Sequence, residues 1–162
     1  MTLLASAPDW LAAILFLSVM LAAVEDGWRM EISNWTSAAI ATGAFVAVAV
    51  NGPATGIWQN IVLFVAVLAA GTVMFDRDWM GGGDIKLLAA CALWFDLSSG
   101  WKLLVAIAIA GGIETLTVLG LRRLPWSEGA RKRALLLRRG GDIPYGVAIA
   151  LGVALMAYWL RR

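Results

Sequence analysis

The stretch Met80-Gly81-Gly82-Gly83-Asp84-Ile85-Lys86 lies in the middle of the chain and leads into an apolar segment. Glycine has no Cβ, so three in a row allow the backbone to turn tightly and another segment to approach closely. An aspartate at the boundary of an apolar segment is costly in a membrane unless it has a use. Asp84 is therefore the first candidate functional residue.

The composition indicates a membrane protein. Of the 162 residues, 61% are hydrophobic and 15% are charged, whereas a soluble domain is nearer to half apolar and a quarter charged. Apolar stretches recur along the whole length, which predicts one all-α domain over residues 1–162 with six transmembrane helices. The first is expected to be retained, since no basic residue precedes it as in a signal peptide. The six segments are Leu3–Val24, Trp35–Val50, Ile57–Phe75, Ile85–Leu97, Trp101–Leu121 and Ile143–Leu160.

The fourth apolar segment is unusually short. From Asp84 to Leu97 a helix would have about 14 residues and measure ~21 Å at 1.5 Å per residue. The hydrocarbon core of a bilayer is ~30 Å thick. We therefore expect the glycine turn to lie below the membrane surface, where other helices shield it.

The positive charges predict the orientation. Glu25–Asn34, Asp76–Gly83 and Arg122–Asp142 are charged connections, whereas Asn51–Gly56 and Ser98–Gly100 are short and nearly neutral. With Lys86 assigned to the charged side, that side has ten cations and the other has three: Lys102, Arg161 and Arg162. Loops rich in Lys and Arg stay in the cytoplasm, so both termini are expected outside. Arg161 and Arg162 conflict mildly with this rule.

The sequence also excludes several kinds of site. It has no histidine and one cysteine, Cys91. This excludes histidine-based triads, internal disulfides and the usual zinc sites. We expect no metal or other cofactor and no nucleic-acid partner.

The predicted topology brings two remote aspartates to one depth. Asp26 would end the first helix at the cytoplasmic face, and Asp84 would begin the fourth helix at the same face. Two neighbouring carboxyl groups can share one proton and activate one water, as in aspartic proteases. Asp84 at a helix N-terminus would be the ionised base, and Asp26 at a helix C-terminus beside Glu25 would be the protonated acid.

Two further charged residues are candidates. Glu114 lies inside the fifth apolar segment, and a carboxylate there is a functional candidate by default. It could contact substrate, tune the aspartate pair, or pair with a hydroxyl such as that of Thr115 or Thr117. Lys86 is two residues from Asp84, so on a helix it faces elsewhere, toward headgroups or another acid.

Three motifs resemble those of the bacterial type IV prepilin peptidases. Asp26–Asn34 resembles their Asp-x5-Ile-Pro-Asn stretch, with Ser33 in the place of proline. Gly81–Lys86 matches their Gly-x-Gly-Asp-x-Lys motif. Ile143–Gly146 resembles the Pro-Tyr-Gly opening of their last helix. The order and spacing cover nearly the whole chain, which is most similar to the small form found in Flp-type (tight-adherence) pilus systems.

The resemblance implies a multi-pass protease of the bacterial inner membrane, with its active site facing the cytoplasm. It would cleave the short basic leader of a Flp-type prepilin or pseudopilin after a glycine, in contact with the pilus assembly machinery. The catalytic residues would be Asp26 and Asp84. Other motif residues would bind substrate or support the site: Gly81, Gly83, Lys86, Asn34, Pro144 and Tyr145. Ser33 should loosen its turn without altering the carboxyl chemistry.

The chain lacks the four-cysteine module of larger family members, which also methylate the new N-terminus, so the sequence predicts the peptidase activity alone. Two rival interpretations remain. A small ion- or proton-coupled transporter could use Asp26, Asp84 and Glu114 as a relay, although no internal repeat is evident. A presenilin-like enzyme would also need Tyr-Asp and Pro-Ala-Leu motifs, and both are absent.

Overall fold

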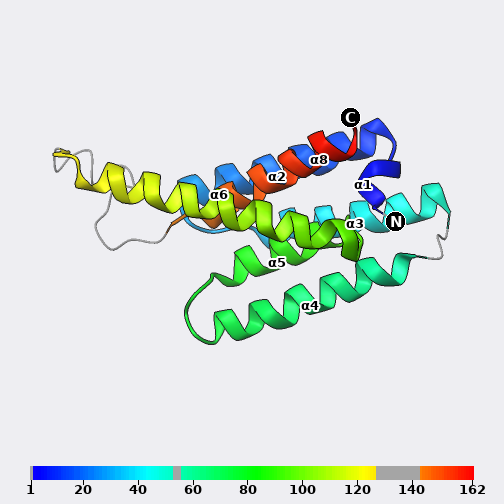
Figure 1. Cartoon of the computed structure of the whole chain (residues 1–162), viewed down its shortest axis with the longest axis horizontal. Coiled ribbons are helices and arrows are strands. Elements are labelled where there is room, and N and C mark those ends of the chain that lie inside the picture. The colour runs from blue at the N-terminus through cyan, green and yellow to red at the C-terminus, as the bar shows by residue number, and fades with distance from the viewer. Residues whose placement is uncertain (1, 53–55, 127–142) are drawn as a thin grey trace.

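The computed structural model describes residues 2–52, 56–126 and 143–162. Within these ranges every regular element is a helix and no strand occurs, so the all-α prediction is confirmed (Figure 1). The helices are α1 (Leu3–Ser6), α2 (Asp9–Arg29), α3 (Asn34–Asn51), α4 (Ile57–Phe75), α5 (Gly82–Ala92), α6 (Leu97–Arg123) and α8 (Tyr145–Leu160).

Several of these helices suit a bilayer. α2, α4 and α6 are long and apolar enough to cross a membrane, and α8 is a shorter apolar helix of 16 residues. Together they indicate a multi-pass membrane protein. α5 has only 11 residues and is even shorter than expected. The six spans and the outside location of both termini stay predictions.

The first predicted segment is divided in two. α1 ends at Ser6, and α2 begins at Asp9 with Pro8 as its N-cap. A residue before proline is disfavoured in the helical region, and Ala7 is extended with φ −66° and ψ 141°. α2 then continues past Val24 to Arg29, so Asp26 lies in its last turn and not at its end.

The boundary between the fourth and fifth segments also differs from the prediction. α5 ends at Ala92, and α6 already begins at Leu97, so Ser98–Gly100 is helical instead of a connection. Asp96 explains this start, because its carboxylate accepts a hydrogen bond from the Ser99 amide at 2.9 Å. An aspartate in this position satisfies an amide that has no partner within the helix. Asp142 stands directly before Ile143 and Pro144, a position that predicts a helix N-cap, but it lies outside the described residues.

Small residues allow the helices to pack closely. α8 packs against α2 and α6, while α5 packs against α3, α4 and α8. A Cβ built on Gly152 of α8 would lie 2.3 Å from Cγ1 of Ile107 in α6, and one on Gly71 of α4 would lie 2.4 Å from Cγ2 of Ile85 in α5. Such contacts are typical of membrane helices, where association depends on close van der Waals packing.

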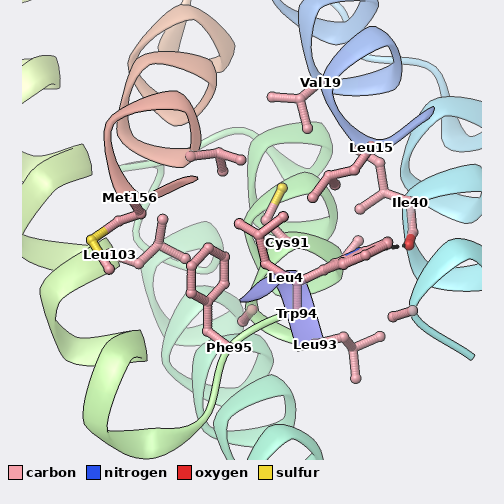
Figure 2. Close-up of a cluster of buried hydrophobic side chains, with 14 of the residues drawn as sticks. Leu4, Leu15, Val19, Ile40, Cys91, Leu93, Trp94, Phe95, Leu103 and Met156 are labelled. Carbon is pink, nitrogen blue, oxygen red and sulfur yellow. Dashed lines mark hydrogen bonds between the residues drawn. The ribbon is translucent and has the colours of Figure 1, made fainter. Parts of the chain in front are cut away.

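The bundle has an end that holds α1 and the end of α8 (Figure 1), and large buried side chains gather there. Figure 2 shows Trp94, Phe95 and Leu4 within this cluster. All three are fully buried, and the indole Nε1 of Trp94 donates to the Ile40 carbonyl at 3.0 Å. The Leu4 amide donates to the Trp94 carbonyl at 3.2 Å, so α1 closes this end of the bundle.

Arg161 fastens the C-terminus to the break between α1 and α2. Its guanidinium donates to the carbonyls of Leu4 and Ala7, both at 3.4 Å, and contacts the carboxylate of Asp9. A structural role therefore accounts for one of the two cations that conflicted with the charge rule.

Candidate active site

Asp26 is buried where α2 meets the start of α8. The residue is 5% exposed, and Oδ2 accepts a hydrogen bond of 2.6 Å from the Gly146 amide. Amides in the first turn of a helix lack partners within it, so a carboxylate suits them. A Cβ on Gly146 would lie 2.9 Å from this oxygen and 3.0 Å from Cβ of Asp26. Glycine is therefore required for this approach of α8 to Asp26.

Asp84 occupies the third position of α5, with Gly81 as the N-cap. Its carboxylate accepts a backbone hydrogen bond from Gly81, which is the acidic half of a capping box. A Cβ on Gly81 would lie 2.9 Å from Oδ2. Oδ1 is buried and has no hydrogen-bond partner among the described residues. The start of α5 thus holds the carboxylate through one hydrogen bond, while Oδ1 has none.

The structure brings Asp26 and Asp84 together. Both border a cavity of about 700 Å³ and a second one of about 310 Å³, and the two carboxyl groups interact electrostatically. Side chains of α4 and α6 border the larger cavity as well, including Phe75 and Thr115. Two acids 58 positions apart in the sequence therefore share one site.

Glu114 is a third carboxylate beside this pair. It is half-buried in α6, and it interacts electrostatically with Asp26 and Asp84 and with the backbone amide of Ala148. Its Oε2 is buried without a hydrogen-bond partner in the described parts of the chain. Thr117, one of the predicted partners, donates to the Ile113 carbonyl of its own helix instead.

The start of α8 contributes two of the predicted residues. Pro144 is the buried N-cap, and Tyr145 is the first helical residue and borders the larger cavity. The ring of Tyr145 lies against Gly111 of α6, where a Cβ would be 2.7 Å from its Cε2.

Gly83 and Lys86 hold the loop after α2 against α5. A Cβ on Gly83 would lie 3.2 Å from Cβ of Ile32 and 3.4 Å from its carbonyl oxygen. Lys86 faces away from Asp84, and its Nζ donates to Oδ1 of Asn34 at 2.9 Å. Lys86 and Asn34 are both exposed, so their hydrogen bond supports the loop outside the cavities.

Ser33 stabilises its turn instead of loosening it. The hydroxyl accepts from the Thr36 amide at 3.3 Å and so caps α3. The Ser33 amide donates to the Glu25 carboxylate at 3.1 Å, a bond that proline could not form. Glu25 also accepts from the Thr36 hydroxyl at 2.9 Å.

These contacts remove the basis for assigning different roles to the two aspartates. The prediction placed Asp26 at a helix C-terminus beside Glu25, but Glu25 is engaged with α3. Asp26 also faces the N-terminus of α8, as Asp84 faces that of α5. The helix dipoles therefore do not distinguish the acid from the base.

The sequence did not predict the hydrogen bond from Gly146 to Asp26 or the contact of the Tyr145 ring with Gly111. A Pro-Tyr-Gly motif at a helix start does signal a close approach, because glycine there leaves room for a neighbour. The identity of that neighbour depends on a contact across 120 residues, which has no local signal.

Comparison with known proteins supports a peptidase. No curated protein and no solved structure matches the chain. A family model matches residues 13–120, which is more than half of the chain and includes both aspartates. By this match, the chain belongs to the type IV leader peptidase family.

Proposed function

We propose that the chain is an aspartic prepilin peptidase that removes the leader of a Flp-type prepilin at the cytoplasmic face. The observation that carries this proposal is the shared site of Asp26 and Asp84, which border the same two cavities from different helices. The family match favours a peptidase over the transporter. The substrate and the catalytic residues are inferred from the charges and the geometry of the site.

The proposed reaction is hydrolysis by a pair of carboxyl groups that share one proton. One carboxylate takes a proton from water as the water oxygen bonds to the scissile carbonyl carbon. The other carboxyl donates a proton to the amide nitrogen as the carbon–nitrogen bond breaks. The products are a new carboxyl end and a new amino end. General acid–base help of this kind contributes about 10²- to 10⁴-fold per group.

The charges around the site suit a basic leader. The residues that border the two cavities include Asp26, Glu31, Asp78 and Asp84, and within the described chain they include no Lys or Arg. Opposite charge steers a cationic segment toward such a cleft. The apolar helix of the prepilin would lie in the bilayer and bind by helix packing.

The proposed location of the site in the membrane follows from the loops that lie at the same end of the molecule. The connection Asp76–Gly81 and the loop after α2 lie beside the site, and both belong to the cation-rich side of the predicted topology. We therefore place the site at the cytoplasmic face of a bacterial inner membrane. Six spans with outside termini and contact with the pilus assembly machinery belong to this proposal.

Co-expression with a Flp-type prepilin tests the function. We expect the wild-type chain to yield a shortened pilin, whose mass places the cleavage after a glycine. Asp26→Asn and Asp84→Asn should each abolish processing, because each removes one member of the pair. Asp9→Asn is the matched control, since Asp9 lies at the other end of α2 and is exposed. Normal processing by either Asp26→Asn or Asp84→Asn in correctly inserted protein would refute the dyad.

A further inference from the structure

The Tyr145 hydroxyl lies among the acids of the site. Tyr145 borders the larger cavity together with Asp26 and Asp84, and its phenol group interacts electrostatically with Asp84 and Glu114. The next residue, Gly146, donates its amide to Asp26. One dipeptide at the start of α8 therefore contacts the site twice, once through the backbone and once through a side chain.

The ring of Tyr145 is held against Gly111 of α6. A Cβ on Gly111 would lie 2.7 Å from Cε2, 3.1 Å from Cζ and 3.1 Å from the hydroxyl oxygen. The ring therefore packs directly on the backbone of α6. Glu114 is three residues further along and thus on the same face of this helix. The backbone of Tyr145 belongs to the first turn of α8 and its ring lies on α6, so the hydroxyl is positioned before substrate arrives.

The proposed hydrolysis needs a hydrogen-bond donor that the two aspartates do not supply. When water adds to the carbonyl carbon, the carbonyl electron pair moves onto oxygen, which becomes negatively charged. One aspartate is then occupied with the proton of the water and the other with the leaving nitrogen. A positioned donor to such an oxygen is typically worth about 10²- to 10³-fold in kcat. A phenol hydroxyl can donate this bond without losing its proton.

We propose that Tyr145 is a further catalytic residue, whose hydroxyl donates a hydrogen bond to the carbonyl oxygen of the tetrahedral intermediate. This inference rests on the proposed peptidase function. The proton stays on the tyrosine throughout, so the step adds no reactant and changes no balance. Trp79, another donor that borders the cavity, lies on the exposed loop before Gly81 and is 69% exposed. Tyr145 is fixed between two helices beside Asp84.

The two tyrosines of the chain provide a matched test. Tyr145→Phe removes one oxygen from the site, while Tyr158→Phe removes the same atom from the exposed far end of the same helix. With purified full-length protein and a prepilin substrate, Tyr145→Phe should lower kcat by about 100-fold and leave KM within about twofold. Tyr158→Phe should behave as wild type. A raised KM with unchanged kcat, or wild-type kinetics, would overturn the proposal.

A second variant separates a catalytic role from a structural one. Gly111→Ala places a Cβ where the ring of Tyr145 lies, so the ring must shift and kcat should fall in the wild-type background. In the Tyr145→Phe background it should have little further effect, because the hydroxyl is already lost. Equal losses in both backgrounds would show that Gly111 and Tyr145 only support the fold.

The aspartate variants separate failure of this inference from failure of the function. If Asp26→Asn and Asp84→Asn are inactive while Tyr145→Phe is fully active, the function stands and the tyrosine proposal fails. If either Asn variant is active, or the wild-type chain cleaves no prepilin, the proposed function itself fails and the tyrosine role falls with it.

Discussion

The two ends of the helix bundle differ in how they use buried groups. At the end that holds α1, Trp94, Phe95 and Leu4 are fully buried, and the indole Nε1 has its hydrogen bond. At the other end, two cavities border the aspartates, and Oδ1 of Asp84 is buried without a partner in the described chain. One end is thus filled by packed side chains, and the other holds carboxylate oxygens without hydrogen-bond partners in the described chain.

α8 shows the same contrast within one helix. Gly146 brings a backbone amide to a carboxylate, whereas Gly152 brings α8 close to Ile107 of α6. The two glycines serve the same geometric need, which is close approach, but they serve different purposes. Changes at the first should therefore alter catalysis, and changes at the second should alter stability.

The largest effect is expected at the packed end. Trp94→Ala should lower the free energy of unfolding by about 3 kcal/mol. This value is near the low end for buried aromatics, because an apolar side chain gains less free energy on leaving lipid than on leaving water. The substitution also leaves the Ile40 carbonyl without its indole donor. Denaturant unfolding in detergent measures the loss, with Trp35→Ala as the exposed control. A loss below about 1 kcal/mol would show that this end does not hold the fold.

The next effect is expected at the site end. Gly146→Ala places a Cβ 2.9 Å from Oδ2 of Asp26, so the carboxylate or α8 must shift. We expect kcat to fall by about 100-fold, since small displacements of reacting groups cost this much. Prepilin cleavage by purified protein measures it.

Gly152→Ala on the same helix is the comparison for that variant. Its added Cβ would clash with Ile107, so it should lower the unfolding midpoint while the folded fraction keeps its activity. If the two alanine variants lose activity equally, the division of α8 into a catalytic and a packing part is wrong.

The sequence predicted the site end better than the packed end. Asp26, Asp84 and the glycine turn carry a local pattern, and the structure brings both acids to one cavity. The short α5 and the start of α6 were harder to predict, because apolar residues continue through Trp94 and Phe95, which are buried outside any helix. Hydropathy alone cannot distinguish such a packed turn from another turn of helix.

A smaller effect is expected from the fastening of the C-terminus. Arg161→Gln should lower the free energy of unfolding by about 1.5 kcal/mol, because it weakens charge-assisted bonds to Leu4 and Ala7 and the contact with Asp9. Arg162→Gln is the neighbouring control, and thermal unfolding of both proteins in detergent measures the difference. Equal midpoints for the two variants would place Arg161 among ordinary surface charges.

The smallest effect concerns the N-cap of α6. Burial opposes ionisation of Asp96, but hydrogen bonds from the hydroxyl and amide of Ser99 and from the Ser98 hydroxyl outweigh it, so the pKa of Asp96 lies below its ordinary value. A lowered pKa in the folded state stabilises the fold above the unfolded-state pKa of about 3.9, and this contribution is lost as the pH falls below it. Asp96→Ala should therefore cost about 1 kcal/mol at pH 7. The cost should shrink as the pH falls below about 4, because the unfolded wild-type chain then binds a proton at Asp96 that the folded chain, with its lowered pKa, does not bind. Unfolding of both proteins at pH 7 and at pH values down to about 3 measures this difference, and a cost independent of pH would show that the cap acts through its shape and not its charge.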